Sequence, residues 1–196
     1  VNRRTEKTDD VINFLDSQYK LKMNLTSFEE KKMYLEGTSS MVLDRKNKIA
    51  YSCLSSRTNL EMLKIWSSKR GYKIKSFYAY YQDKPVYHTN VLMWIGDQII
   101  GLTSSLIEEN ILNELKLSLS EDAELILFDE HQIACFCGNM IQLNKGLNKY
   151  LLLSKTAHDS LNKNQLTILN RFYDDLIIQD ISTIEMIGGG SVRCMI

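Results

Sequence analysis

Three residues of the sequence have side chains that could act together on a reacting carbon: Cys194, His88 and Glu36. A cysteine thiolate is a nucleophile, an imidazole transfers protons near neutral pH, and a carboxylate can orient that imidazole or hold a cationic substrate. Together they match covalent catalysis by a nucleophile, a base and an orienting group. They lie in segments of unusual composition at 35–38, 87–90 and 188–195, and a fourth such segment covers 137–140.

Each of these residues alone has a simpler interpretation. Cys194 could be a small buried hydrophobe at a strand end, His88 a hydrogen-bonded, half-buried histidine, and Glu36 an exposed loop carboxylate. The glycine run at 188–190 favours a functional cysteine, because consecutive glycines allow positive φ and a close approach of ligand to main chain. Arg193 or a nearby imidazolium could favour the thiolate. The prediction therefore rests on the set of residues.

The sequence argues against a metal site. Cys135 and Cys137 are one residue apart and lie near His131, whereas zinc sites usually have two separated pairs of ligands. We expect neither a metal nor an organic cofactor. The remaining candidates are expected to be an exposed histidine, a core cysteine and two packing tryptophans, namely His158, Cys53, Trp66 and Trp94.

Composition excludes several partners. The 24 basic residues balance the 24 acidic ones without a block of like charge, which argues against nucleic acid and anionic membranes. The apolar runs are far shorter than the roughly 20 residues of a membrane span. Four sparse cysteines and the lack of an opening signal-peptide pattern favour a cytoplasmic compartment. A chain of 196 residues that is 44% hydrophobic can bury one sizeable core.

An internal repeat organises the chain. Hairpin patterns at 40–54, 91–102 and 140–153 recur with a period of about fifty residues. An amphipathic helix pattern follows each hairpin, and then a short strand at 73–77, 124–128 or 176–179. The repeat predicts an α/β fold of strand-strand-helix-strand units. Units arranged around an axis would bring their loops to one end, where a central site could form.

Local signals set the expected limits of these elements. The segment before residue 36 predicts a helix near 9–19 and a strand near 21–24. The helix-end signals are two capping boxes and a closing glycine, namely Thr58 with Glu61, Asn162 with Gln165, and Gly71.

With these motifs in view, the chain resembles the amidinotransferase, or guanidino-group-modifying, superfamily, and within it the arginine deiminase-related group that includes citrulline hydrolases. The resemblance is carried, in order, by LEGTSSMVLDR at 35–45, YHTNV at 87–91, GNM at 138–140 and GGGSVRCM at 188–195. It implies a pentein fold, in which five such units surround a pseudo-fivefold axis with the active site at that axis.

The resemblance also implies roles for the site residues. Cys194 corresponds to the nucleophile, His88 to the general acid and base, and Glu36 to the acidic residue beside that histidine. The matching motifs place Asn90, Asn139 and Arg193 in substrate binding. The implied reaction is hydrolysis of a C–N bond at a guanidine or ureido carbon through a covalent cysteine intermediate, without a cofactor.

Two departures from the family pattern affect this interpretation. Many relatives have an aspartate where this chain has Asn90; a neutral amide suits a neutral ureido group, which favours a citrulline-like substrate over arginine. The chain also has about three units and flanking pieces instead of five. We therefore expect residues 1–196 to be a single amidinotransferase-like catalytic domain that lacks N-terminal units.

The missing units leave alternatives open. Either a homo-oligomer or a complementing chain supplies the remaining units, or the sequence is a fragment. The rival function is a catalytically silent binding or assembly module. Papain-like peptide hydrolysis is disfavoured, because there the cysteine precedes the histidine and starts a helix, whereas Cys194 follows His88 and a glycine run.

Overall fold

The structure is a computed structural model that describes residues 8–119 and 123–196. The chain forms two compact units, one up to Met33 and a larger one from Tyr34 onward. Along the described residues, no helix has both the length and the apolar character needed to cross a membrane.

The first unit contains two helical elements, α1 (Asp9–Gln18) and the 3-10 helix η2 (Thr26–Lys31). The hydroxyl of Thr8 caps α1 by accepting a hydrogen bond from the N–H of Val11. The predicted helix is confirmed, but the strand predicted near 21–24 is wrong. That segment has no strand partner, and Leu21 is 59% exposed, so neither pairing nor burial holds it as a strand.

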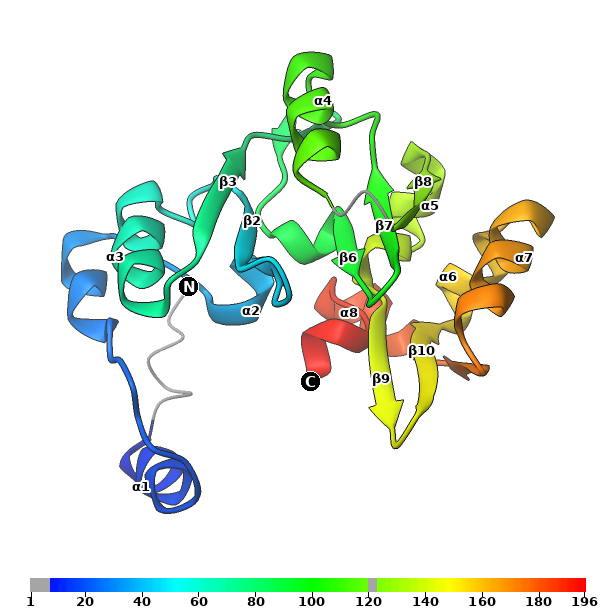
Figure 1. Cartoon of the computed structure of the whole chain (residues 1–196). Coiled ribbons are helices and arrows are strands. Elements are labelled where there is room, and N and C mark those ends of the chain that lie inside the picture. Colours follow the sequence, from blue (N-terminus) through cyan, green and yellow to red (C-terminus); the bar gives the residue numbers. More distant parts are fainter. Residues whose placement is uncertain (1–7, 120–122) are drawn as a thin grey trace. The chain divides into compact units, whose positions relative to one another are not determined.

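The larger unit repeats one topology in three sheets (Figure 1). In each sheet an antiparallel hairpin is followed by a helix and a third strand parallel to the second. The predicted strand-strand-helix-strand repeat is therefore confirmed within the described residues. The elements are β1 (Val42–Asp44), β2 (Ile49–Cys53), α3 (Leu60–Arg70) and β3 (Lys73–Phe77); β6 (Met93–Ile95), β7 (Ile99–Thr103), α4 (Glu109–Ser118) and β8 (Glu124–Phe128); β9 (Ile141–Lys145), β10 (Asn148–Ser154), α7 (Lys163–Phe172) and β11 (Asp175–Gln179).

The helix ends test the predicted capping signals. Asn162 and Gln165 form the predicted capping box of α7, and Gly71 closes α3 with a φ of 68°. The predicted capping box of Thr58 is wrong, because the Oδ1 of Asn59 caps α3 by accepting from the N–H groups of Glu61 and Met62. Thr58 instead bridges back to Ser55 in the preceding turn, which leaves the cap to its neighbour.

Short helical turns join the repeated units and replace the first residues of the predicted hairpin strands. The turns before the three hairpins are α2 (Gly37–Ser40), η3 (Thr89–Val91) and η4 (Cys137–Asn139). The chain ends in α8 (Ser182–Gly188) and η5 (Val192–Met195). The other connecting elements are β4 (Tyr80–Tyr81), β5 (Lys84–Pro85), α5 (Glu130–Ala134) and α6 (Lys155–Ser160).

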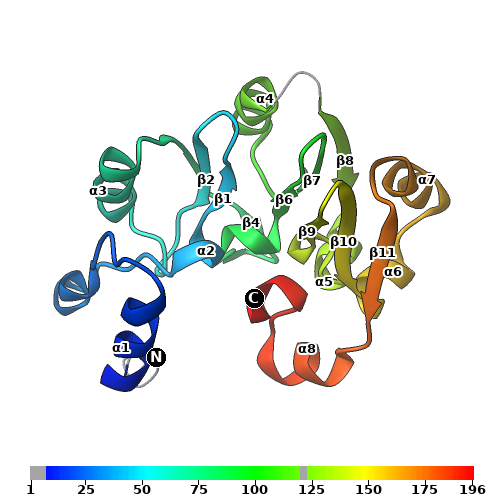
Figure 2. The same ribbon diagram turned by 60° about the horizontal axis from the view of Figure 1, so that its bottom comes forward.

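The core lies between neighbouring sheets. One cluster combines β2 residues such as Tyr51 with Met93 and Leu102 of the second sheet, and another combines Trp94 with Leu151 of the third. The first strand of each sheet lies next to the first strand of the neighbouring sheet, β1 beside β6 and β6 beside β9. The sheets fan out from these strands, and their helices lie on the outside (Figures 1 and 2). The C-terminal elements α8 and η5 return to the same side (Figure 2).

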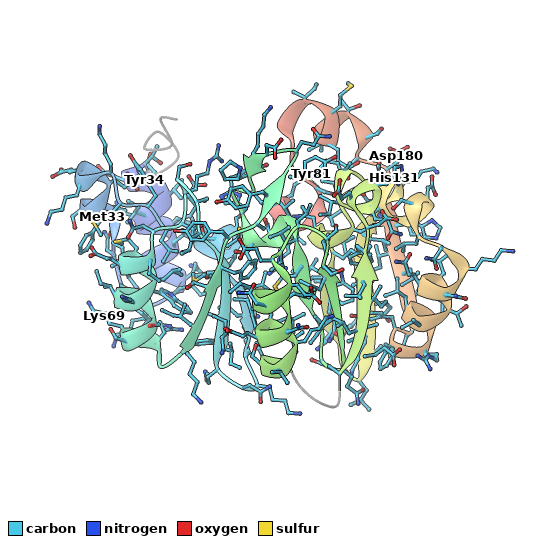
Figure 3. The ribbon with its side chains drawn as sticks, turned by 90° about the horizontal axis from the view of Figure 1, so that it is seen from above. Met33, Tyr34, Lys69, Tyr81, His131 and Asp180 are labelled. Atoms are coloured by element: carbon cyan, nitrogen blue, oxygen red, sulfur yellow. The ribbon has the colours of Figure 1, made fainter. Side chains whose placement is uncertain are left out.

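Viewed from above, the three sheets of the larger unit follow one another across the view (Figure 3). Lys69 of α3 lies toward one end, Tyr81 of β4 near the middle, and His131 of α5 and Asp180 beyond β11 toward the other side. The arrangement is a mixed α/β fold in which the short turns before the three hairpins share one side of the molecule.

Candidate active site

Two side-chain amides donate hydrogen bonds to the sulfur of Cys194. Cys194 lies in η5 and is exposed. The Nδ2 of Asn139 is 3.2 Å from its Sγ, and the Nδ2 of Asn90 is 3.4 Å from it. The two asparagines come from η4 and η3, the turns before the third and second hairpins. Two side-chain amides from separate turns therefore converge on one sulfur.

Main-chain contacts hold these turns together. The Nδ2 of Asn139 also donates to the carbonyl of Asn90 at 3.0 Å, and the N–H of Arg193 donates to the Oδ1 of Asn139 at 3.1 Å. Gly138 is required here, because a Cβ at this position would lie 2.0 Å from the carbonyl oxygen of Val91. The nucleophile loop and the two turns therefore form one hydrogen-bonded cluster.

His88 and Glu36 form the second half of the site. The Nε2 of His88 is 2.7 Å from the Oε2 of Glu36, and the histidine is only 5% exposed. A carboxylate at this distance fixes the orientation of the ring. Glu36 also lies 3.7 Å from the Nη1 of Arg57, so the histidine ring and a guanidinium share the carboxylate.

Tyr87 connects the histidine loop with the glycine run. Its ring meets the ring of His88 edge-on, with centroids 4.8 Å apart, and its hydroxyl donates to the carbonyl of Gly189 at 3.3 Å. The guanidinium of Arg57 lies over the ring of Tyr87, 4.8 Å from the ring centroid. Sequence reasoning missed Arg57 and Tyr87 as site residues, because a single arginine or tyrosine in a loop carries no distinguishing spacing.

Arg193 places a cation beside the nucleophile. Burial lowers the pKa of its guanidinium to about 10, so the group stays protonated at neutral pH. Its Nη1 donates to the carbonyl of Met93 at 3.3 Å. The guanidinium of Arg193 therefore places a positive charge near Cys194.

The structure brings all six predicted site residues into this region: Cys194 with Asn90, Asn139 and Arg193, and His88 with Glu36. The other cysteines are separate. Burial raises the pKa of both Cys53 and Cys137 to about 12. Among residues 8–119 and 123–196, no group of three or more histidine, cysteine or acidic side chains is arranged to hold a metal ion.

Three peripheral predictions have mixed outcomes. Trp94 and Cys53 are buried as predicted, and Trp66 packs against the core while partly exposed. His158, predicted to be exposed, is partly exposed: 31% of its side chain is accessible, and its Nδ1 lies 3.2 Å from the Oδ1 of Asp159.

Comparison with known proteins finds a family model that matches the chain. The family model for N,N dimethylarginine dimethylhydrolase, eukaryotic, matches residues 1–196. No curated protein matches the sequence.

Solved structures share the fold at low identity. ArgZ, an arginine dihydrolase from the ornithine-ammonia cycle in cyanobacteria, is 12% identical with a TM-score of 0.68 over 87% of this chain and 27% of its own. Its N-terminal domain, covalently bonded to a reaction intermediate, is matched over 61% of its length, again with a TM-score of 0.68, 12% identity and 87% of this chain covered. SxtG, an amidinotransferase from Microseira wollei in the saxitoxin biosynthetic pathway, is 11% identical with a TM-score of 0.55 over 80% of this chain and 45% of its own.

The fold and these matches define the class of protein: a member of the pentein amidinotransferase superfamily. Within it, the chain belongs to the N,N dimethylarginine dimethylhydrolase family, in its eukaryotic form. It spans less than two thirds of the length of the structures it resembles.

Proposed function

We propose that this chain carries the nucleophile-bearing part of a hydrolase that cleaves a C–N bond at a guanidine or ureido carbon. The observation that carries the proposal is the convergence on one thiol of two amides from separate turns, at 3.2 and 3.4 Å. Family membership supports the same class of reaction. N,N-dimethylarginine, arginine and citrulline are the substrates to compare.

In the proposed reaction, the Cys194 thiolate attacks the central carbon and His88 gives a proton to the departing nitrogen as the C–N bond breaks. This leaves a thiouronium or thiocarbamoyl group on the sulfur. Water then attacks the same carbon while His88 takes its proton, and the C–S bond breaks to restore the thiolate. Glu36, at 2.7 Å, holds the imidazole in place through both steps.

Asn90 supplies a further argument about the substrate. Its Nδ2 meets the sulfur, while its buried Oδ1 accepts no hydrogen bond from the described residues. A buried acceptor without a donor costs free energy, and a substrate N–H beside the reacting carbon would satisfy it. Because the amide is neutral, it binds a ureido group without a charge mismatch, which favours citrulline over arginine.

The proposal includes the domain organisation. We propose that residues 1–196 are part of one amidinotransferase-like catalytic domain, and that the three observed units belong to a five-unit propeller. The 61% coverage of the ArgZ N-terminal domain agrees with three units out of five. The remaining units would come from a longer polypeptide, a second copy or a complementing chain.

The test is turnover of the three substrates by wild type, Cys194→Ala and Cys135→Ala. Loss of the nucleophile should reduce kcat at least about 10³-fold, whereas Cys135→Ala removes a half-buried thiol outside the cluster and should keep wild-type turnover. Each protein is assayed alone and within any longer natural polypeptide that contains the chain. Undiminished turnover by Cys194→Ala would contradict the proposal. Turnover by none of the proteins in either form would favour the silent binding module.

A further inference from the structure

We propose that Glu185 is a positioning residue for the nucleophile: its carboxylate fixes the loop that presents the Cys194 thiol. The inference rests on the proposed function and deepens it by adding a residue that touches neither the thiol nor its amide donors. It is argued from the burial of Glu185, its two hydrogen bonds and the short path from its partner Ser191 to the sulfur.

The burial pattern of α8 is unusual. Glu185 is the only buried residue of this helix and is 5% exposed, whereas the neighbouring Met186 and Ile187 are each 79% exposed. A surface helix normally buries apolar side chains and exposes its charges. A buried carboxylate costs free energy unless hydrogen bonds compensate for the lost water. Packing alone therefore does not account for a glutamate at this position.

Two hydroxyl groups compensate the carboxylate. The hydroxyl of Ser191 donates to its Oε1 at 2.6 Å, and the hydroxyl of Thr156 donates to its Oε2 at 2.6 Å. Thr156 belongs to α6, which directly follows β10 of the third sheet. Glu185 has no ion-pair partner among the described residues. It therefore connects the nucleophile loop to the third unit through both of its oxygens.

Ser191 transmits this anchor to the nucleophile. Its side chain is 1% exposed, and its carbonyl accepts the N–H of Cys194 at 2.9 Å, so it sets the start of the turn η5. The residue before Ser191, Gly190, passes so close to Cys194 that an added Cβ would lie 3.1 Å from the Cβ of Cys194 and 3.3 Å from its Sγ. A displaced Ser191 would therefore move the sulfur away from its two amide donors.

The first measurement is the kinetics of Glu185→Ala and Glu185→Gln. The alanine variant loses both hydrogen bonds, and a nucleophile misplaced by about 1 Å should lower kcat about 10²-fold. KM should stay within about twofold, because Glu185 lies outside the proposed substrate-binding groups. The glutamine variant keeps the shape and one acceptor oxygen, so it should recover about tenfold of that loss.

The second measurement needs no substrate. Alkylation of Cys194 by iodoacetamide at pH 7.5 should be about tenfold slower in Glu185→Ala than in wild type, because the displaced sulfur loses its hydrogen bonds to the amides of Asn90 and Asn139. Tyr51→Phe is the matched control. It removes a 2.9 Å hydrogen bond to the carbonyl of Ser118, at the end of α4 and outside the site, and should change neither kcat nor the alkylation rate.

The outcomes separate this inference from the proposed function. If Cys194→Ala is inactive while Glu185→Ala keeps wild-type kcat and alkylation rate, the positioning role is overturned and the hydrolase proposal stands. Equal losses in Glu185→Ala and Tyr51→Phe would likewise overturn it, because they would reflect destabilisation alone. If wild type turns over no substrate, the alkylation rate decides by itself: a tenfold decrease supports the role, and an unchanged rate overturns it.

Discussion

Asn90 is the residue at which substrate charge can be tested. It is 1% exposed, and its amide reaches the nucleophile from the turn next to His88. Replacing it with aspartate adds a buried negative charge beside the reacting carbon. A guanidinium gains a charge-assisted hydrogen bond from that change, whereas a neutral ureido group does not.

Asn90→Asp should therefore shift the ratio of kcat/KM for arginine to that for citrulline at least about tenfold toward arginine. The variant also loses the amide donor to Cys194, so both rates should fall and only their ratio reports the charge. Asn144→Asp is the control, because it adds the same charge at an exposed position outside the site. A wild type that prefers arginine, or a ratio that does not change, would contradict the argument.

The four cysteines differ in the residues around them, which predicts their order of reaction. Cys194 is exposed, whereas Cys53 and Cys137 are 0% exposed with a pKa raised by burial to about 12. At pH 7.5 less than about 10⁻⁴ of each buried thiol is ionised. Iodoacetamide followed by peptide mass analysis should find Cys194 modified first in the folded protein and all four thiols modified in urea. Equal modification of all four under native conditions would show an unreactive Cys194.

Sequence alone identified the residues whose chemistry is distinctive, and it missed those that act through position. Cys194, His88 and Glu36 were candidates because a thiol, an imidazole and a carboxylate lay in unusual loops. Arg57 contacts Glu36, and Glu185 contacts Thr156, only because separate segments fold together. A buried glutamate and a surface glutamate look the same in a sequence, so no pattern could have singled out Glu185.

At the scale of elements, the site depends on how closely the turns η3 and η4 approach each other. Gly138→Ala would place a methyl group 2.0 Å from the main-chain oxygen of Val91 and 2.9 Å from the carbonyl carbon of Leu92. The backbone must move to relieve that overlap, at a cost of about 2 kcal/mol or more. Thermal unfolding should show a lower Tm, and kcat should fall because Asn139 moves with its neighbour.

A control for this prediction exists within the glycine run. Gly188 has no heavy atom within 4 Å of an added Cβ and does not need a positive φ. Gly188→Ala should therefore keep the wild-type Tm within about 1–2 °C. A Gly138→Ala protein that is as stable and active as Gly188→Ala would show that the two turns are loosely packed.

The repeated elements followed from the sequence because their signals are local. Period-two strands, helical spacing and end signals such as Gly71 act within a few residues of each other. The strand predicted at 21–24 failed because a strand depends on a partner elsewhere in the chain. The loops before the hairpins were predicted as loops, but not their helical turns, since hydrogen bonds from distant residues, such as the 2.8 Å bond between the hydroxyl of Thr89 and the N–H of Cys53, fix their shape.

For the molecule as a whole, stability comes from cores that lie between units. Cys53 is in the cluster shared by the first and second sheets, and Cys137 is in the cluster shared by the second and third. Removing either sheet would expose its neighbour, so the three units should unfold together. One buried thiol lies in each of these two clusters, so both thiols should become accessible in the same unfolding transition.

These thiols predict a loss of stability at alkaline pH. Their folded pKa of about 12 lies above the ordinary value of 9.0, so the folded state holds its protons more tightly than the unfolded state. The resulting stabilisation is complete below pH 9 and is lost as pH rises toward 12. Each thiol should contribute a decrease of about 1.4 kcal/mol per pH unit in the free energy of unfolding within that window.

Urea unfolding between pH 9 and 10 checks this prediction, with the slope of the free energy of unfolding against pH as the measured quantity. The slope is insensitive to the cavity that a substitution leaves, because the cavity costs the same free energy at each pH. From pH 9 to pH 10, wild type should lose about 2 kcal/mol from the two thiols, because the unfolded thiols ionise only in part at the start of this window, and Cys137→Ala about half as much. Cys135→Ala, which removes a half-buried thiol outside both clusters, should keep the wild-type slope. The buried Tyr51 and Tyr173 also have a raised pKa, but their contribution in this window is smaller and is the same in wild type and in both variants. If Cys137→Ala and wild type have the same slope, the thiol of Cys137 does not stay protonated in the folded core.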